Sequence, residues 1–158
     1  MNYINETFFS NLIFFFFFLG AVYESINIVK ENPYRLAHDI FGIGFLTADK
    51  IAQKLGFDEN SSQRAEAGIL HVLHELADEG HVFYEFDLLI EKAQEILNVE
   101  KELLNTALKS LEIKKKIVIE ELSNEDTTKV GVFLSGYHMA EQQTAKLLSS
   151  IRDTANNL

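Results

Sequence analysis

The sequence predicts a mainly α-helical fold that ends in a small β-hairpin. Residues 62–79 repeat apolar side chains at the helical period, and residues 115–122, KKIVIEEL, follow a strand pattern. Glycine, proline and asparagine punctuate the chain at short intervals, so the helices must be short. Hydrophobic residues make up 47% of the chain and charged residues 24%, which is typical of a globular protein.

Short helices separated by glycine or proline are predicted for the first part of the chain. An apolar helix over residues 7–19 is expected to end at Gly20, because glycine favours helix C-termini. Residues 23–30 form an amphipathic helix that the Asn32-Pro33 pair ends, and a new helix starts at Pro33. After Gly42-Ile43-Gly44, the segment FLTADKIAQKLG forms another helix. The side chains expected on its inward face are Ala48, Ile51, Ala52 and Leu55.

From residue 62 onward, the order of the expected elements is that of a winged helix. Residues 62–79 form a helix, EGHVFY is a short extended piece, and residues 86–97 and 100–111 form two helices joined at Asn98. Two strands, KKIVIEEL and KVGVFLS, flank the turn SNEDTT, and residues 137–152 form a closing helix. The expected core residues of the first helix are Ala65, Ile69, Val72, Leu73 and Leu76.

These elements suggest three parts. Residues 1–57 hold the apolar N-terminal helix and a pair of helices around the glycines. Residues 58–136 form a winged-helix-like domain, and residues 137–158 form a connecting helix. The fold class is therefore mainly α with a small β wing.

The N-terminal run LIFFFFFLGAV, residues 12–22, is too short for a membrane span, which needs about 20 residues. Glu6 precedes it and no lysine or arginine does, unlike in a signal peptide. We therefore expect a cytoplasmic protein that does not cross a membrane, with an interfacial segment as the alternative. Five consecutive phenylalanines, Phe14–Phe18, cannot all face one core, so we expect a partner or self-association to cover some of them. The absence of cysteine excludes disulfides and thiolate metal sites.

The formal net charge of −10 argues against independent, tight binding of nucleic acid. Residues 57–87 have a net charge of −7, whereas residues 101–116 have a net charge of +3. In a winged helix the third helix usually enters the DNA groove, and here that helix lies in the positive stretch. Its candidate DNA-contacting residues, together with those leading into the wing, are Lys101, Asn105, Lys109, Lys114, Lys115 and Lys116. The alternative is a solvated helix face in a domain used only for packing.

The stretch DIFGIGFLTADK is a second candidate for contact with a polyanion. Glycines at Gly42 and Gly44, on either side of Ile43, can take positive φ and let another backbone approach closely. The helix that follows then directs its N-terminal amides at an anion, and Lys50, one turn into that helix, can add positive charge. The alternative is an ordinary tight turn that packs two helices together.

Three segments, ENPYRLAHDIFGIGFLTADKIAQKLG, AGILHVLHELADEGHVF and VFLSGYHMAEQQTAKLL, carry a resemblance to a known family. Together they resemble the N-terminal region of RecD-like, TraA-type DNA helicases, relatives of the exodeoxyribonuclease V alpha subunit, over about residues 26–152. The resemblance implies a helix-hairpin-helix from Asp39 through Leu55, with Thr47 and Lys50 at the start of its second helix, within reach of a phosphate. Asp49 would repel DNA there, and we expect it to cap its helix. It also implies that the parent protein is a 5′-to-3′ ATP-dependent DNA helicase in DNA repair or recombination, and that the present part binds DNA weakly and without sequence preference.

The helicase motor itself is not expected within this chain. A motor of this kind needs G-x-x-x-x-G-K-[ST], and the one related stretch, GVFLSGYH, has Tyr137 and His138 where lysine and the hydroxyl residue belong. The chain is thus interpreted as a non-catalytic fragment, without a cofactor, that precedes motor domains using ATP and Mg²⁺. The segment HVLHE does not have the order of a zinc-protease helix, and no metal site is expected. A protein-interaction module without DNA contact is the alternative function.

Overall fold

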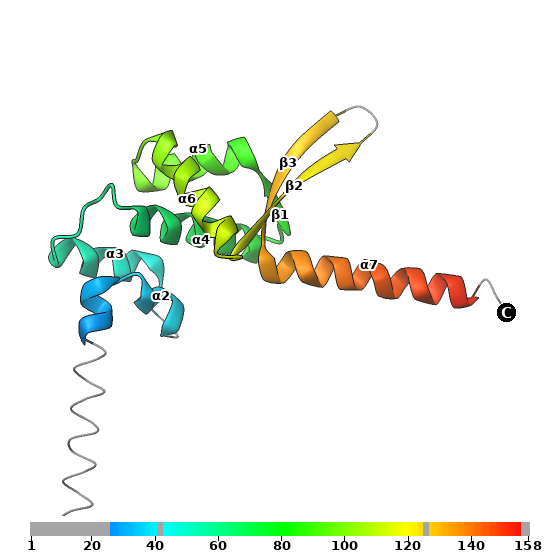
Figure 1. Cartoon of the computed structure of the whole chain (residues 1–158), viewed down its shortest axis with the longest axis horizontal. Coiled ribbons are helices and arrows are strands. Elements are labelled where there is room, and N and C mark those ends of the chain that lie inside the picture. The colour runs from blue at the N-terminus through cyan, green and yellow to red at the C-terminus, as the bar shows by residue number, and fades with distance from the viewer. Residues whose placement is uncertain (1–25, 41–42, 125–126, 156–158) are drawn as a thin grey trace, which may run out of the picture. The chain divides into compact units, whose positions relative to one another are not determined.

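The computed structural model describes residues 26–40, 43–124 and 127–155 (Figure 1). The chain divides into two compact units, Met1–Phe57 and Asp58–Leu158. The expected helix over residues 7–19, the run Phe14–Phe18 and Gly42 lie outside the described residues. Within the described ranges, no helix is both long enough and apolar enough to cross a bilayer.

The first unit contains a helical stretch at residues 26–31, then α2 (Arg35–Asp39) and α3 (Phe45–Lys54). The break before α2 is the one predicted at Asn32-Pro33. There the Asn32 side-chain oxygen accepts a hydrogen bond from the Tyr34 amide at 3.1 Å, an Asx turn that reverses the chain. Gly56 follows the end of α3, and its positive φ of 79° is a conformation that glycine adopts without strain.

The inward face of α3 differs from the predicted one. Its buried residues are Phe45, Ala48, Asp49 and Ala52, which recur every three or four positions. The ring of Phe45 stacks on Tyr34, with centroids 6.0 Å apart. Ala48 and Ala52 were predicted correctly and Ile51 is half-buried, but Leu55 is wrong: it is 47% exposed, because it lies past the helix end.

The second unit has the predicted order of a winged helix (Figure 1). A three-stranded antiparallel sheet in the order β1-β3-β2 accompanies the helices, so the expected fold class, mainly α with a small β wing, is confirmed. In the sheet, Phe83 lies opposite Phe133, and Ile117 lies opposite Leu134. The elements are α4 (Ser62–Asp78), β1 (Phe83–Glu85), α5 (Phe86–Leu97), α6 (Lys101–Ile113), β2 (Ile117–Asn124), β3 (Thr127–Leu134) and α7 (Ser135–Ala155).

The core of this unit lies between α4, α5, α6 and the sheet. All five residues of α4 that the helical period predicted to be inward are buried. Fully buried side chains of α5, α6, β2 and β3 complete this core, namely Leu89, Leu104, Leu108, Ile117 and Val132. Burial of apolar surface is the main stabilising term of such a core. The hydrophobic period is therefore sufficient to identify this face.

The ends of the helices use left-handed residues. Gly80 follows α4 with φ 97°, and Asn98, the residue expected to join two helices, follows α5 with φ 52°. Lys115 follows α6 with φ 57°, although lysine has no intrinsic preference for this conformation. Its amide donates to the Glu112 carbonyl and the Lys116 amide donates to the Leu111 carbonyl, both at 2.9 Å, so the end of α6 is a Schellman motif.

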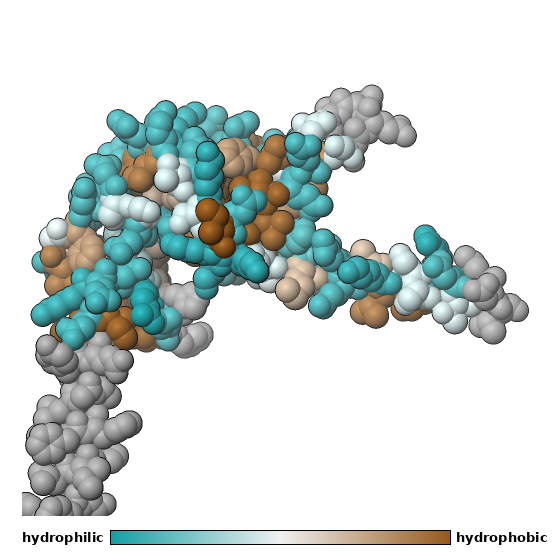
Figure 2. Space-filling view, viewed as in Figure 1, coloured by the Kyte–Doolittle hydropathy of each residue, from teal (hydrophilic) through white to brown (hydrophobic). Residues whose placement is uncertain are grey.

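The hairpin and the last helix are longer than predicted. The strands extend to Asn124 and resume at Thr127, so that part of the SNEDTT turn is strand. Helix α7 starts at Ser135, and its first turn contacts the sheet through His138, whose ring meets Phe133 with centroids 5.0 Å apart. From residue 139 to 154 the helix is exposed, and hydrophobic surface is visible along it in Figure 2.

Candidate nucleic-acid interface

The turn before α3 presents the start of that helix to the surface. The Ile43 amide donates to the Ile40 carbonyl at 3.1 Å, which closes the turn, and Gly44 follows as the N-cap residue. The Gly44 carbonyl accepts hydrogen bonds from the Thr47 and Ala48 amides at 3.1 and 3.2 Å. Within the described residues, the amides of Gly44 and Leu46 have no acceptor. The start of α3 therefore has hydrogen-bond donors available, together with the positive end of the helix dipole.

Gly44 does not have the conformation that the sequence led us to expect. Its φ is −86° and its ψ is 171°, an extended conformation open to every residue type, so the expected positive φ is wrong here. A Cβ built on Gly44 would meet nothing within 4 Å. Neither backbone strain nor packing inside the described structure requires glycine at this position. What glycine adds is an uncovered backbone that a ligand can approach closely.

Asp49 lies inside the first unit rather than at the helix start. It is buried, and one carboxylate oxygen accepts a hydrogen bond from the Tyr34 hydroxyl at 2.8 Å. No side chain caps the start of α3, so the expected capping role of Asp49 is wrong. The hydrogen bond joins the NPY segment to the TAD segment. It also turns the carboxylate of α3 away from the surface.

The exposed face of α3 carries the predicted Thr47 and Lys50, both exposed. Lys54 lies one turn further on the same face and is also exposed, but the sequence analysis missed it. The spacing of four residues between Lys50 and Lys54 was the signal that could have revealed it. Because Asp49 is buried, the exposed charges of α3 are both positive. This face is suited to a polyanion despite the net charge of the chain.

The predicted residues of α6 are less favourably arranged. Lys101, Lys109 and Lys115 are exposed, and Asn105 is half-buried. The Lys114 ammonium, by contrast, is paired with Glu66 of α4. Its Nζ lies 2.6 and 2.8 Å from the two carboxylate oxygens, and the Ser110 hydroxyl also donates to Glu66, at 2.7 Å. Lys116 leads from α6 into β2 and is exposed.

The charge that remains on α6 is small. The exposed residues Glu102 and Glu112 lie on the same helix as Lys101 and Lys109, and they offset part of its positive charge. Lys114 is shared with a carboxylate, so it has less attraction left for a phosphate. Of the two candidate regions, α3 therefore has the larger net positive charge on its exposed face for its length.

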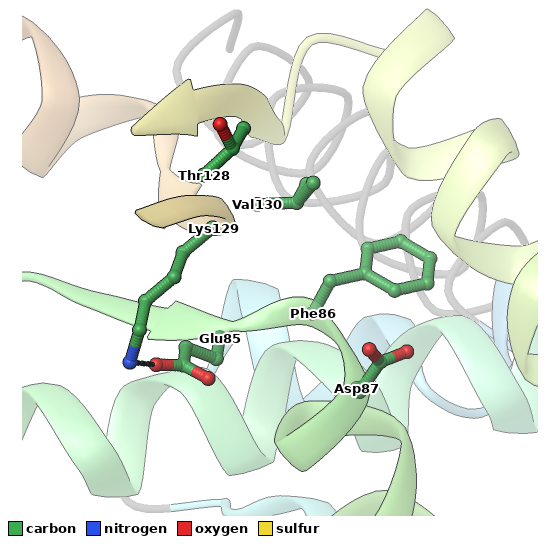
Figure 3. A pocket seen from close by; sticks show the side chains of 6 residues that line it. All are labelled: Glu85, Phe86, Asp87, Thr128, Lys129 and Val130. Carbon is green, nitrogen blue, oxygen red and sulfur yellow. Dashed lines mark hydrogen bonds and ion pairs between the residues drawn. The ribbon is translucent and has the colours of Figure 1, made fainter. Parts of the chain in front are cut away.

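A hollow of about 410 Å³ lies between the start of α5 and strand β3 (Figure 3). In it, the Lys129 ammonium points to Glu85 and forms an ion pair with its carboxylate, while Phe86 and Asp87 follow at the start of α5. The lining includes the hydroxyl of Thr128 but no histidine that could activate it as a nucleophile. Among the described residues, no group of three side chains could hold a metal ion.

Comparison with known families supports the resemblance seen in the sequence. Residues 20–83 match the family model of the ATP-dependent RecD2 DNA helicase helix-hairpin-helix domain. The match includes α2, α3 and α4 and ends at the first residue of β1, so the expected relation of this region to RecD-like helicases is confirmed. The residues after 83, including α5, α6 and the wing, lie outside the match.

Proposed function

We propose that this chain, whose residues 20–83 match the helix-hairpin-helix domain of RecD2 DNA helicases, is an accessory region of a RecD-like DNA helicase that contacts the DNA backbone. The contact is made by the start and the exposed face of α3. The observation that carries the proposal is the uncovered backbone at Gly44, directly before a helix whose only buried charge is Asp49.

The geometry favours a phosphate as the group that is bound. The amides of Gly44 and Leu46 are donors at a helix N-terminus, where the dipole stabilises an anion. The open space above Gly44 allows a phosphate oxygen to reach those donors. Lys50 and Lys54 follow on the exposed face and add positive charge. None of these groups reads a base edge, so the contact has no sequence preference.

The parent activity that we propose is 5′-to-3′ unwinding of DNA driven by ATP. The sequence of this chain contains no G-x-x-x-x-G-K-[ST] motif, so ATP and Mg²⁺ would be held by motor domains of the parent protein. The role of the described part is to bind and orient the DNA backbone. In this proposal the winged-helix-like domain serves packing, since Lys114 is paired with Glu66 and acidic residues accompany the other lysines of α6.

Binding of the full chain to labelled DNA, followed by fluorescence anisotropy over a range of salt concentrations, tests the proposal. Two unrelated sequences should bind equally and weakly, and binding should fall as salt rises. Lys50→Glu should weaken binding and make the salt slope shallower by about 1, the value for one lost phosphate contact. Lys146→Glu, the same charge change on the exposed part of α7, is the matched control and should have little effect.

Two results would contradict the proposal. One is binding that does not depend on salt. The other is an equal loss of affinity in Lys50→Glu and Lys146→Glu, because a general effect of net charge would then explain both. Either result would remove the proposed contact at α3. Binding that ignores both salt and the Lys50→Glu change would favour the alternative, a protein-interaction module without direct DNA contact.

A further inference from the structure

Strand β2 is an edge of the three-stranded sheet, since β3 lies between β1 and β2. Its first half, with the residues before it, reads KKIVIEE over residues 115–121. This heptapeptide is symmetric about Val118: an isoleucine lies on each side, then charges of opposite sign. We propose that two copies of this chain associate by antiparallel pairing of β2 with β2 about Val118. The inference is independent of the proposed DNA contact.

The backbone of β2 is in the right phase for this pairing. The Lys116 carbonyl accepts a hydrogen bond from the Ser135 amide at 3.1 Å, which fixes the residues of β2 that bond inward to β3. Because hydrogen bonding alternates along an antiparallel strand, Ile117, Ile119 and Glu121 direct their backbone groups to the outer edge. In the proposed register Ile117 lies opposite Ile119 of the second copy, so two residues with outward groups meet. The pairing therefore forms a regular ladder.

The side chains of the two copies are complementary in the same register. Val118 meets Val118 at the two-fold axis, and Lys116 lies opposite Glu120 of the second copy. These are non-hydrogen-bonded positions, where facing side chains approach most closely. Lys115 lies outside this ladder, because its left-handed conformation belongs to the end of α6. Symmetry repeats the Lys116–Glu120 ion pair, so one interface has two matched charge pairs.

Neighbouring registers lack this match. Pairing centred on Ile119 places Lys116 opposite Leu122 and Glu120 opposite Val118. Pairing centred on Ile117 places Lys116 opposite Val118, so the Lys116 charge has no opposite charge facing it. Charges on an edge strand ordinarily prevent pairing by leaving like charges facing each other. Here the same charges select one antiparallel register.

The surroundings of the edge leave room for a second strand. A hollow of about 410 Å³ adjoins Ile117 and Val118, with the end of α6 on one side and the start of α7 on the other. The Glu120 side chain is 49% exposed, and His138 holds it in place through a contact of 2.8 Å between Nε2 and Oε2.

Charge reversal with mixing is the decisive experiment, measured on the full chain by sedimentation equilibrium from micromolar to millimolar concentration. Lys116→Glu and Glu120→Lys each turn both symmetric pairs into like-charged pairs. Each variant alone should associate roughly 10–100-fold more weakly than wild type, because attraction is replaced by repulsion at two sites. An equimolar mixture of the two should associate again, since opposite charges face each other in the mixed dimer.

Two controls separate this effect from others. Lys146→Glu and Glu95→Lys make the same charge changes at exposed positions of α7 and α5 and should leave association unchanged. Circular dichroism melting should show that every variant is folded. A wild-type chain that is monomeric throughout the range would overturn the proposal. Association that both reversals leave unchanged, or that mixing does not restore, would overturn it too, and would direct attention to the Phe14–Phe18 run.

Discussion

Replacing Gly44 by aspartate should make the protein more stable and a poorer DNA binder. Gly44 has the extended conformation of an N-cap residue, and no side chain caps α3. An aspartate oxygen there can accept hydrogen bonds from the first-turn amides, which adds a few tenths of a kcal/mol over glycine. Its charge at the helix start adds about 0.3–1 kcal/mol. Lower entropy of the unfolded chain adds about 0.4–1 kcal/mol.

The sum is an increase of about 1–2 kcal/mol in the free energy of unfolding, since nothing lies within 4 Å of the new Cβ to oppose it. The same substitution should lower the affinity for DNA. The carboxylate would occupy the amides and repel a phosphate, and repulsion between unit charges at 4 Å in water alone costs about 1 kcal/mol, roughly fivefold in affinity. Differential scanning calorimetry and fluorescence anisotropy measure the two effects separately.

Gly136→Asp is the matched control for this substitution. Gly136 is also exposed, lies in the first turn of α7, and has nothing within 4 Å of a Cβ. It should leave DNA affinity close to that of wild type. If Gly44→Asp is folded and binds DNA as tightly as wild type, the start of α3 does not contact phosphate. An equal loss in both variants would show that net charge alone is responsible.

Three further predictions concern stability, measured by urea unfolding. Tyr34→Phe should cost about 1.5–3 kcal/mol, because it removes a hydrogen bond to the buried Asp49 carboxylate; if Asp49→Asn abolishes none of this cost in a double-mutant cycle, the contact is not the cause. Lys115→Gly should add about 1 kcal/mol by relieving a left-handed lysine, and no gain would mean that its side chain compensates. Arg64→Met should cost about 2–4 kcal/mol, because the buried guanidinium donates to the carbonyls of Glu59 and Leu97 at 3.0 and 2.9 Å; a cost within error would show that water replaces it.

Local signals were sufficient to predict most of the fold. The junction predicted at Asn98 is confirmed, and glycine likewise follows the helices at Gly56 and Gly80, because residues that tolerate the left-handed conformation favour helix ends. The core face of α4 followed from its apolar period for the same reason. Local signals did not predict that Lys115 adopts that conformation, since its residue type gives no indication of it.

The charged and polar residues of the candidate site were harder to predict. Asp49 is buried, and its carboxylate accepts a hydrogen bond from Tyr34, 15 residues earlier in the chain. Its negative charge is therefore turned away from the surface. Lys114 is paired with Glu66, 48 residues away. Such partners are set by tertiary distance, which the sequence pattern does not contain. Counting charges along a segment therefore overestimated the positive charge that α6 offers to DNA and underestimated the positive charge that α3 offers.

The small number of exposed lysines on α3 limits what this surface can do alone. If Lys50 and Lys54 each neutralise one phosphate, the logarithmic salt slope of duplex binding is about −2, a weak dependence compared with proteins that make six to ten such contacts. The negative charge elsewhere on the chain is screened beyond about 10 Å at 0.1 M salt, so it does not prevent a local contact. A contact of this strength is effective where another part of the same protein already holds the DNA, because tethering raises its effective concentration to about the millimolar range. We therefore expect α3 to bind DNA only weakly by itself, and to increase the affinity for DNA of the helicase motor domains to which it is linked.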